Sequence, residues 1–260
     1  MTAHARRSRR RSPFGAVVGT VGEILITLGV ILGLFLVWEL WWTNVQSAQA
    51  QAKDVASLGW AYEPQDAPAT PEYLTPSTKA PKVDKEPKLL TTFATLYVPR
   101  FGDDYAKTIT EGTDKATVLD TKGIGHYVGT AMPGGVGNFA IAGHRTTYGK
   151  PFHDIDKLKT GDPVIVQTKD GWYVYAVTDH LITGWRNGEQ VAPVPGDTTG
   201  TKKPTQRLLT MTSCHPVWQP IHRYIVHGEL VYWAPPDGNK VPKELVTGTF
   251  DAGMLDGITG

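Results

Sequence analysis

The stretch that decides the fold is "LLTMTSCHPVWQPIHRYIVHGEL", residues 208–230. Two runs rich in Leu, Thr, Ile, Val and Tyr flank a segment that is broken by Pro216 and Pro220. β-branched and aromatic side chains favour strands, whereas proline interrupts them. We therefore expect two neighbouring strands, with Cys214 at the end of the first and Arg223 at the start of the second.

Similar runs precede this stretch. "ATLYVPRFG" alternates, "NFAIAGHR" is apolar, and "DPVIVQTKDGWYVYAVTDHLI" holds two β-rich runs around Asp170-Gly171, which is a hairpin signal. Helical stretches such as "KPFHDIDKL" are few and short. Roughly six to eight short strands separated by turns predict a closed β-barrel or a β-sandwich between Leu89 and about Trp233.

The N-terminus carries the pattern of a membrane anchor. Five arginines lie within "RRSRRR", residues 6–11, and the apolar run at residues 17–38 holds one charge, Glu23. About 20 apolar residues suffice for a helix to cross a bilayer, and the tryptophans at the end of the run suit the membrane boundary. Because positive flanks of a first helix tend to stay cytoplasmic, we expect the N-terminus inside the cell and the remainder outside.

A cleaved signal peptide is the alternative for this apolar run. "SAQAQA", residues 47–52, offers small residues of the kind found at cleavage sites. The run is longer than the roughly 7–15 residues of a signal peptide, which favours an uncleaved anchor. A buried helix of a soluble domain is disfavoured, because no polar face recurs at helical spacing.

Two further segments have compositions that do not build a core. Residues 62–87 are rich in Pro, Thr, Ala and charge, so we expect an extended spacer through a cell envelope. The tail after residue 235 is Gly-rich and is expected to be loosely ordered. The predicted organisation is a cytoplasmic Arg-rich tail (1–13), a transmembrane helix (14–42), a Pro-rich extracellular spacer (43–88), a catalytic β-domain (89–235) and a Gly-rich tail (236–260).

The chain contains one cysteine, Cys214, which cannot form an internal disulfide. Buried structural cysteines are commoner than catalytic ones, but this one ends a strand-like run, where a barrel can present a side chain at its rim. A thiol nucleophile also needs a base or a cationic partner, because the thiolate is the reactive form. Among the histidines, His144 follows the apolar run "FAIAG", and His126 lies in a Gly-rich loop in which we expect it to hydrogen-bond.

These features together resemble the sortases, membrane-anchored cysteine transpeptidases of Gram-positive bacteria. The family pattern around the nucleophile is T-L-x-T-C, followed by Arg. This chain has the similar segment "TMTSC", residues 210–214, followed by Arg223, with Met in place of Leu and Ser in place of Thr. "GHYVGTAMPGGVGNFAIAGHR" resembles the segment that leads to the catalytic histidine, here His144. "TLYVPRFG" resembles the first barrel strand, and "GHRTTYGKPF" is most similar to class E, with class D the nearest alternative.

The resemblance implies an all-β fold, an eight-stranded antiparallel sortase-type β-barrel with short helices, preceded by one N-terminal transmembrane helix. It also implies a substrate, surface proteins with a C-terminal LPXTG-type sorting signal, LAXTG being favoured in class E. Cys214 would attack the carbonyl between Thr and Gly, and the amine of a lipid-linked peptidoglycan precursor would release the product. His144 would transfer protons, and Arg223 would hold an oxyanion or the peptide backbone.

Other predictions concern ligands. Tyr148, Ser213 and Thr212 are predicted to contact the sorting peptide, although Tyr148 is equally suited to a structural role. No cofactor and no metal are expected, because "DDY" at 103–105 and "HDID" at 153–156 are too sparse for calcium. The net charge of +1 does not favour a nucleic-acid partner.

Two rival functions remain open. An L,D-transpeptidase also uses Cys and His outside the membrane, but its motif resembles H-G-C-x-R, whereas Arg223 follows Cys214 at a distance of nine residues. A tethered β-domain without catalysis, with Cys214 as a structural residue, is the second rival. Slow labelling by a thiol reagent would indicate that domain, and fast labelling a nucleophile.

Overall fold

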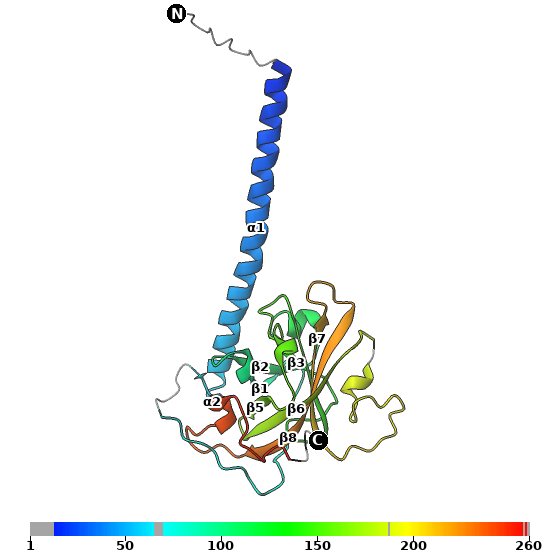
Figure 1. Ribbon diagram of the computed structural model, residues 1–260. Coiled ribbons are helices and arrows are strands. Elements are labelled where there is room, and N and C mark those ends of the chain that lie inside the picture. The colour runs from blue at the N-terminus through cyan, green and yellow to red at the C-terminus, as the bar shows by residue number, and fades with distance from the viewer. Residues whose placement is uncertain (1–12, 65–69, 187, 257, 259–260) are drawn as a thin grey trace, which may run out of the picture. The chain divides into compact units, whose positions relative to one another are not determined.

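The computed structural model describes residues 13–64, 70–186, 188–256 and 258 (Figure 1). The chain forms two compact units, Met1–Trp42 and Thr43–Gly260. Residues 1–12 of the predicted cytoplasmic tail lie outside the described residues, and so does the arginine run on which the predicted orientation depends.

The helix α1 (Pro13–Ser57) contains the predicted anchor. It is long and apolar enough to cross a membrane, and none of its most apolar window is buried within the protein. Large side chains such as Leu25 and Ile26 are exposed, and lipid tails are a more favourable surrounding for them than water. The predicted apolar helix is therefore present as a candidate membrane span, and it continues past the predicted end at residue 42 to Ser57.

The last turns of α1 belong to the second unit and contact it directly. The buried side chain of Gln51 accepts a hydrogen bond from the backbone N–H of Thr108 at 3.2 Å and donates one to the carbonyl of Lys122. Asp54 forms an ion pair with Lys122 at 3.2 Å. The sequence analysis assigned this segment to the extracellular spacer, but Gln51 and Asp54 hold the end of the helix against the rest of the second unit.

The second unit is built on eight strands that close into a barrel in the order β1-β2-β3-β4-β7-β8-β6-β5. The predicted eight-stranded barrel is therefore confirmed. Its strands are β1 (Thr92–Tyr97), β2 (Ala106–Glu111), β3 (Ile124–His126), β4 (Gly137–Gly143), β5 (Pro163–Thr168), β6 (Gly171–Gly184), β7 (Arg207–His215) and β8 (His222–Ala234). Short helical segments connect them, namely η2 (Pro99–Phe101), η3 (Lys115–Leu119), η4 (Ile155–Lys157) and η5 (Gly188–Val191), and α2 (Lys243–Thr247) follows β8.

Strand direction differs from the prediction at two places. β2 pairs with β3 and β4 pairs with β7 in parallel, so the expectation of a wholly antiparallel barrel is wrong. Parallel neighbours need a crossover connection rather than a tight turn. The segment containing η3 supplies it between β2 and β3, and the β5–β6 hairpin lies between β4 and β7 in the chain.

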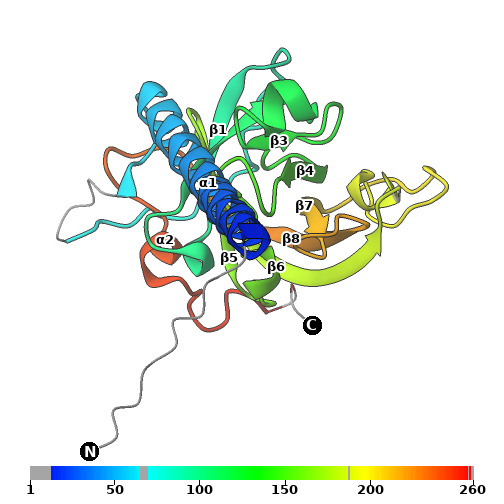
Figure 2. The same ribbon diagram turned by 90° about the horizontal axis from the view of Figure 1, so that it is seen from above.

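The predicted hairpin and the predicted strand pair are both present. β5 and β6 are antiparallel, with Thr168 opposite Gly171 across the turn. β7 and β8 are antiparallel and lie side by side in both views (Figures 1 and 2). Their register places Cys214 opposite Arg223. Alternation along β7 places Leu209 and Met211 in the core, so that Cys214 lies on the other face of the strand.

The segments on either side of the barrel are more ordered than their composition suggested. Leu74, in the predicted spacer, and Val241, in the predicted tail, are buried and hydrogen-bond through their backbones at 2.9 Å. They complete a second apolar cluster with Tyr97, Ile165 and Trp172 on the outside of β1, β5 and β6. Because two isolated apolar residues in polar segments give no periodic pattern, composition does not reveal this packing.

We expect Leu74→Ala to lower the free energy of unfolding of the Thr43–Gly260 unit by about 2–4 kcal/mol, because a buried leucine leaves a cavity when truncated. Val83→Ala is the matched control in the same segment, since Val83 is exposed and its loss should cost within about 0.5 kcal/mol. Urea unfolding followed by tryptophan fluorescence measures both values. Equal stability of the two variants would contradict the packing of this segment.

Candidate active site

The ends of three adjacent strands create the site. β4 and β7 run in parallel with Ala142 opposite Thr212, and the hydroxyl of Ser213 donates a 2.8 Å hydrogen bond to the carbonyl of Gly143. One residue further along each strand are His144 and Cys214. Because equivalent positions of paired strands present their side chains to the same face, β4 and β7 carry His144 and Cys214 to one rim of the barrel.

The third strand adds the arginine. Cys214 and Arg223 are directly opposite in the antiparallel pair of β7 and β8, and such side chains lie on one face with Cβ atoms about 4.5–5.5 Å apart. Cys214 is a free, partly exposed thiol. Arg223 is partly exposed, and its Nη1 donates to the carbonyl of His222 at 3.1 Å. Strand register thus directs the three residues to one rim of the barrel, and their catalytic roles stay predictions.

His144 is paired with a carboxylate that the sequence reasoning missed. Its Nε2 lies 2.7 Å from Oδ1 of Asp120, and Oδ2 of Asp120 lies 2.7 Å from Nζ of Lys115. Partial burial raises the pKa of Asp120, but the hydrogen bonds from Lys115 and His144 outweigh it, so that the pKa is below its usual value. Asp120 is therefore ionised at neutral pH and acts as an acceptor toward both neighbours.

Tyr148 lies beside the histidine. Its ring centroid is 5.2 Å from that of His144, and Nζ of Lys115 lies 5.1 Å from the centre of the tyrosine ring. Tyr148 has φ +52°, a left-handed conformation that is unfavourable for a residue with a bulky side chain. The loop after β4 therefore holds this ring against His144, and contact of Tyr148 with a peptide stays a prediction.

The two other predicted substrate contacts have buried side chains. Thr212 donates to the carbonyl of Ile141 at 3.3 Å, and Ser213 bonds Gly143 as described above. Both hydroxyls link β7 to the backbone of β4. These bonds support the register that aligns the site, and a direct contact of either residue with a peptide stays a prediction.

Arg145 is a second residue that the sequence reasoning missed. Its side chain is almost fully buried, with 2% of the residue exposed, and its Nη2 forms a 2.6 Å ion pair with Asp156. Nη1 donates to Nδ1 of His215 at 3.0 Å and to the carbonyl of Cys214 at 3.4 Å, and the guanidinium lies 5.5 Å from the centre of the Tyr224 ring. Arg145 therefore connects the ends of β4, β7 and β8, and it contacts the backbone of Cys214.

The charge of Arg145 also affects its neighbour. Burial first, and then the cation of Arg145, lower the pKa of His215. The neutral imidazole can accept the hydrogen bond of the guanidinium through Nδ1, which a protonated ring could not. The sequence does contain one signal for this residue. Arg145 directly follows His144 at the end of a strand, where successive side chains point to opposite faces, so that one of the two faces inward.

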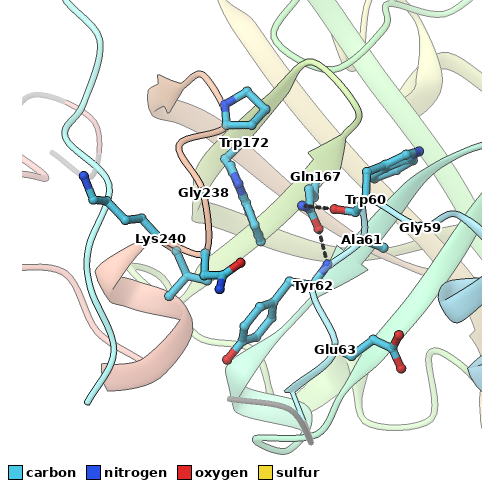
Figure 3. A pocket seen from close by; sticks show the side chains of 12 residues that line it. Gly59, Trp60, Ala61, Tyr62, Glu63, Gln167, Trp172, Gly238 and Lys240 are labelled. Carbon is cyan, nitrogen blue, oxygen red and sulfur yellow. Dashed lines mark hydrogen bonds between the residues drawn. The ribbon is translucent and has the colours of Figure 1, made fainter. Parts of the chain in front are cut away.

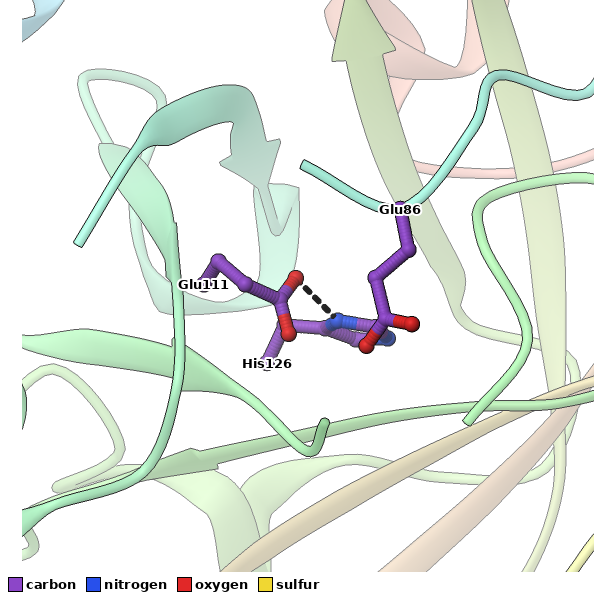
Figure 4. A group of neighbouring side chains, drawn as sticks. All are labelled: Glu86, Glu111 and His126. Atoms are coloured by element: carbon purple, nitrogen blue, oxygen red, sulfur yellow. Dashed lines mark hydrogen bonds and ion pairs between the residues drawn. The ribbon is translucent and has the colours of Figure 1, made fainter. Parts of the chain in front are cut away.

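His126 is placed in a buried pair outside this rim. Its Nδ1 is 2.7 Å from Oε2 of Glu111 (Figure 4). Its Nε2 is 2.9 Å from the hydroxyl of Thr130 in its own Gly-rich loop, where the sequence predicted a hydrogen bond. Because that hydroxyl donates to the carbonyl of Tyr127 at 2.7 Å, Nε2 of His126 is the donor toward Thr130. The imidazole is committed to this network on both sides.

Glu86 approaches the same pair, so the group has the composition of a cation site. One possible ligand atom from each of Glu86, Glu111 and His126 lies within 4.8 Å of the others (Figure 4). Both nitrogens of His126 are already hydrogen-bonded, and a cation would have to displace one of these bonds. The geometry fits an internal hydrogen-bonded pair, and the expected absence of a metal stays a prediction.

A cavity of about 530 Å³ lies elsewhere, between Trp60, Tyr62 and Trp172 on one side and residues 236–241 on the other (Figure 3). Trp172 begins β6, whereas Thr183 near the end of that strand pairs with Arg223. The cavity is therefore at the opposite end of β6 from the cysteine, histidine and arginine, and it takes no part in their chemistry.

Comparison with known proteins gives consistent matches. The family model described as "Sortase domain" matches residues 96–231. The chain is 38% identical over 253 residues to Sortase SrtE1 of Streptomyces coelicolor, covering 93% of this chain and 65% of that protein. It is 35% identical over 255 residues to Sortase SrtE2 of the same organism, covering 92% and 93%. The solved structure of sortase E from Streptomyces avermitilis is 39% identical, with a TM-score of 0.54, and the match covers 61% of this chain and 99% of that chain.

An eight-stranded closed barrel with a cysteine, a histidine and an arginine at one rim defines the sortase class of transpeptidases. The chain belongs to the sortase family. The three relatives reported above carry class E names, which supports the resemblance to class E. The chain spans 65% of the length of the first relative, Sortase SrtE1.

The two arginines near Cys214 should respond differently to lysine. Arg145→Lys should lower the free energy of unfolding by about 1.5–3 kcal/mol, because an ammonium cannot replace the buried, multiply hydrogen-bonded guanidinium. Arg223→Lys, the control at a partly exposed position, should change stability by less than about 0.5 kcal/mol. Urea unfolding measures both, and an unaffected Arg145→Lys variant would contradict the linking role of Arg145.

Proposed function

We propose that the protein is a membrane-anchored cysteine transpeptidase that cleaves a sorting signal of the LPXTG or LAXTG type between Thr and Gly. It then joins the new C-terminus to the amine of a lipid-linked peptidoglycan precursor. The observation that carries this proposal is the register that places Cys214, Arg223 and His144 at one barrel rim. Family membership and the class E relatives support the same reaction.

Each residue has a role that its chemistry allows. The thiolate of Cys214 attacks the carbonyl carbon of the Thr–Gly bond, and His144 as an imidazolium gives a proton to the departing amine. The neutral imidazole then takes a proton from the incoming amine as it attacks the thioester. Arg223 presents planar, permanently charged donors beside Cys214, where the oxyanion develops.

The rival enzyme class is less well supported. An L,D-transpeptidase motif places Arg two residues after Cys, where this chain has Pro216, and Arg223 instead approaches from the neighbouring strand. The tethered domain without catalysis leaves the Asp120–His144 pair and the partly exposed thiol without a task.

Incubation of the Thr43–Gly260 unit with LPXTG and LAXTG peptides and a peptide amine should give a transpeptidation product, detected by mass. Cys214→Ala should abolish it, and His144→Ala should lower kcat by about 10²–10⁴-fold, the usual contribution of acid–base catalysis. Arg223→Lys should lower kcat by roughly 10²–10³-fold if its planar fork holds the oxyanion. His180→Ala, which removes an exposed histidine of β6, should retain most turnover.

Product formation by Cys214→Ala at the wild-type rate would overturn the proposal. Circular dichroism of each variant separates loss of chemistry from loss of fold. Kinetics are read as kcat and KM separately, because a change confined to KM at Arg223 would indicate ground-state peptide binding.

The proposed localisation is a single-pass membrane protein with a cytoplasmic N-terminus and an extracellular barrel. The single cysteine supplies a direct test. A membrane-impermeant maleimide added to intact, wall-stripped cells should label Cys214, and the Cys214→Ala variant should remain unlabelled. Ser8→Cys in the Cys214→Ala background should be protected until the cells are lysed, and labelling of Ser8→Cys in intact cells would reverse the orientation.

A further inference from the structure

The pairing of Asp120 with His144 has a consequence for the direction of proton transfer. Asp120 lies on the crossover between β2 and β3, directly after η3 (Lys115–Leu119) and far from His144 in the sequence. Its carboxylate oxygen Oδ1 is 2.7 Å from Nε2 of His144, and only 16% of the Asp120 side chain and 14% of the His144 side chain are exposed. A short, largely shielded contact of this kind is stronger than a surface ion pair.

The hydrogen-bonding capacity of the two groups fixes the tautomer. An ionised carboxylate only accepts hydrogen bonds, so Nε2 of His144 must carry a proton whether the ring is neutral or charged. The proton that the imidazole gains and loses is therefore the one on Nδ1. A neutral ring with this tautomer has its free lone pair on Nδ1, directed away from Asp120.

We propose that Asp120 is a positioning residue that holds the imidazole of His144 with its proton on Nε2 and leaves Nδ1 to exchange protons with the leaving and attacking amines. This inference rests on the proposed transpeptidase function. Its chemical logic is that of a Ser-His-Asp triad, in which the acid orients the imidazole without itself accepting a proton. No bond is made or broken at Asp120, because the proton is gained and lost at Nδ1 of His144.

Lys115 makes the proposal testable by a single-atom change. Its ammonium, which can only donate, contacts Oδ2 of Asp120 at 2.7 Å. In the Asp120→Asn variant the amide oxygen is attracted to Lys115, so the amide NH₂ turns toward His144. The NH₂ group donates to Nε2 and forces the neutral ring to carry its proton on Nδ1, where a lone pair is needed.

The conservative variant Asp120→Asn is therefore expected to be less active than the truncation Asp120→Ala. Asp120→Asn should lower kcat by about 10²-fold or more, because the wrong tautomer is imposed. Asp120→Ala should lose less, about tenfold, because a water molecule can accept from Nε2 and leave the tautomer free. The double variant Lys115→Met/Asp120→Asn should recover to the level of Asp120→Ala, since the amide can then rotate. KM should stay within about threefold throughout, because Asp120 does not touch the peptide.

Asp114→Asn is the matched control. Asp114 is a carboxylate at the other end of the same helical turn, where Oδ1 accepts from the N–H of Thr117 at 2.9 Å, and an asparagine can cap that turn equally well. This variant should keep the wild-type kcat. Thermal unfolding of all variants shows whether any loss arises from a damaged fold.

The tautomer itself is measured by ¹⁵N–¹H correlation NMR of the full chain in detergent micelles with ring-¹⁵N histidine, His144 being assigned from a His144→Gln variant. The wild type should show neutral His144 with the proton on Nε2, and Asp120→Asn should show it on Nδ1. An unchanged tautomer, or a wild-type kcat in Asp120→Asn, would overturn the positioning role. Failure of the proposed function shows differently: the wild type would then form no transpeptidation product, or Cys214→Ala would keep the wild-type rate, which separates the two outcomes.

Discussion

The site depends on the register between β4, β7 and β8. Parallel pairing of β4 with β7 aligns Gly143 with Ser213, and antiparallel pairing of β7 with β8 aligns Cys214 with Arg223. A shift of one residue in either pair would move a functional side chain to the opposite face of the sheet. The core residues of β7, such as Met211, fix this register because their burial is lost when the strand slips.

The charged groups around Cys214 have different physical tasks. Arg145 is buried and fully engaged with Asp156, His215 and the carbonyl of Cys214, so it stabilises the arrangement of strand ends. Arg223 is partly exposed on the face of Cys214 and can reorient toward a substrate oxygen. Removing Asp156 would therefore leave the buried guanidinium of Arg145 without its carboxylate partner.

The strands at the centre of the site could be predicted from sequence, because β-branched runs and prolines mark their bounds locally. The strand end at Cys214, the start at Arg223 and the hairpin around Asp170 all follow from such patterns. The position of His144 required the family resemblance, since a histidine after an apolar run has many uses. The closed barrel was one of two architectures compatible with the same pattern of strands.

Other features could not be predicted, because they depend on contacts between residues far apart in the chain. Asp120 lies 24 positions from His144, and nothing in its local sequence marks it as a partner. The parallel pairing of β4 with β7 depends on where the β5–β6 hairpin folds, and local patterns do not encode strand direction. The packing of Leu74 against Val241 joins segments that precede and follow the whole barrel.

The covalent state of Cys214 is the most direct test of the account. The Thr43–Gly260 unit is mixed with an LAXTG or LPXTG peptide without an amine, quenched in acid, digested and analysed by mass spectrometry. If Cys214 is the nucleophile, the peptide fragment ending at Thr is attached to the digestion product containing Cys214. Cleavage of the peptide with the acyl group on another residue, or with no thioester at any time, would contradict it.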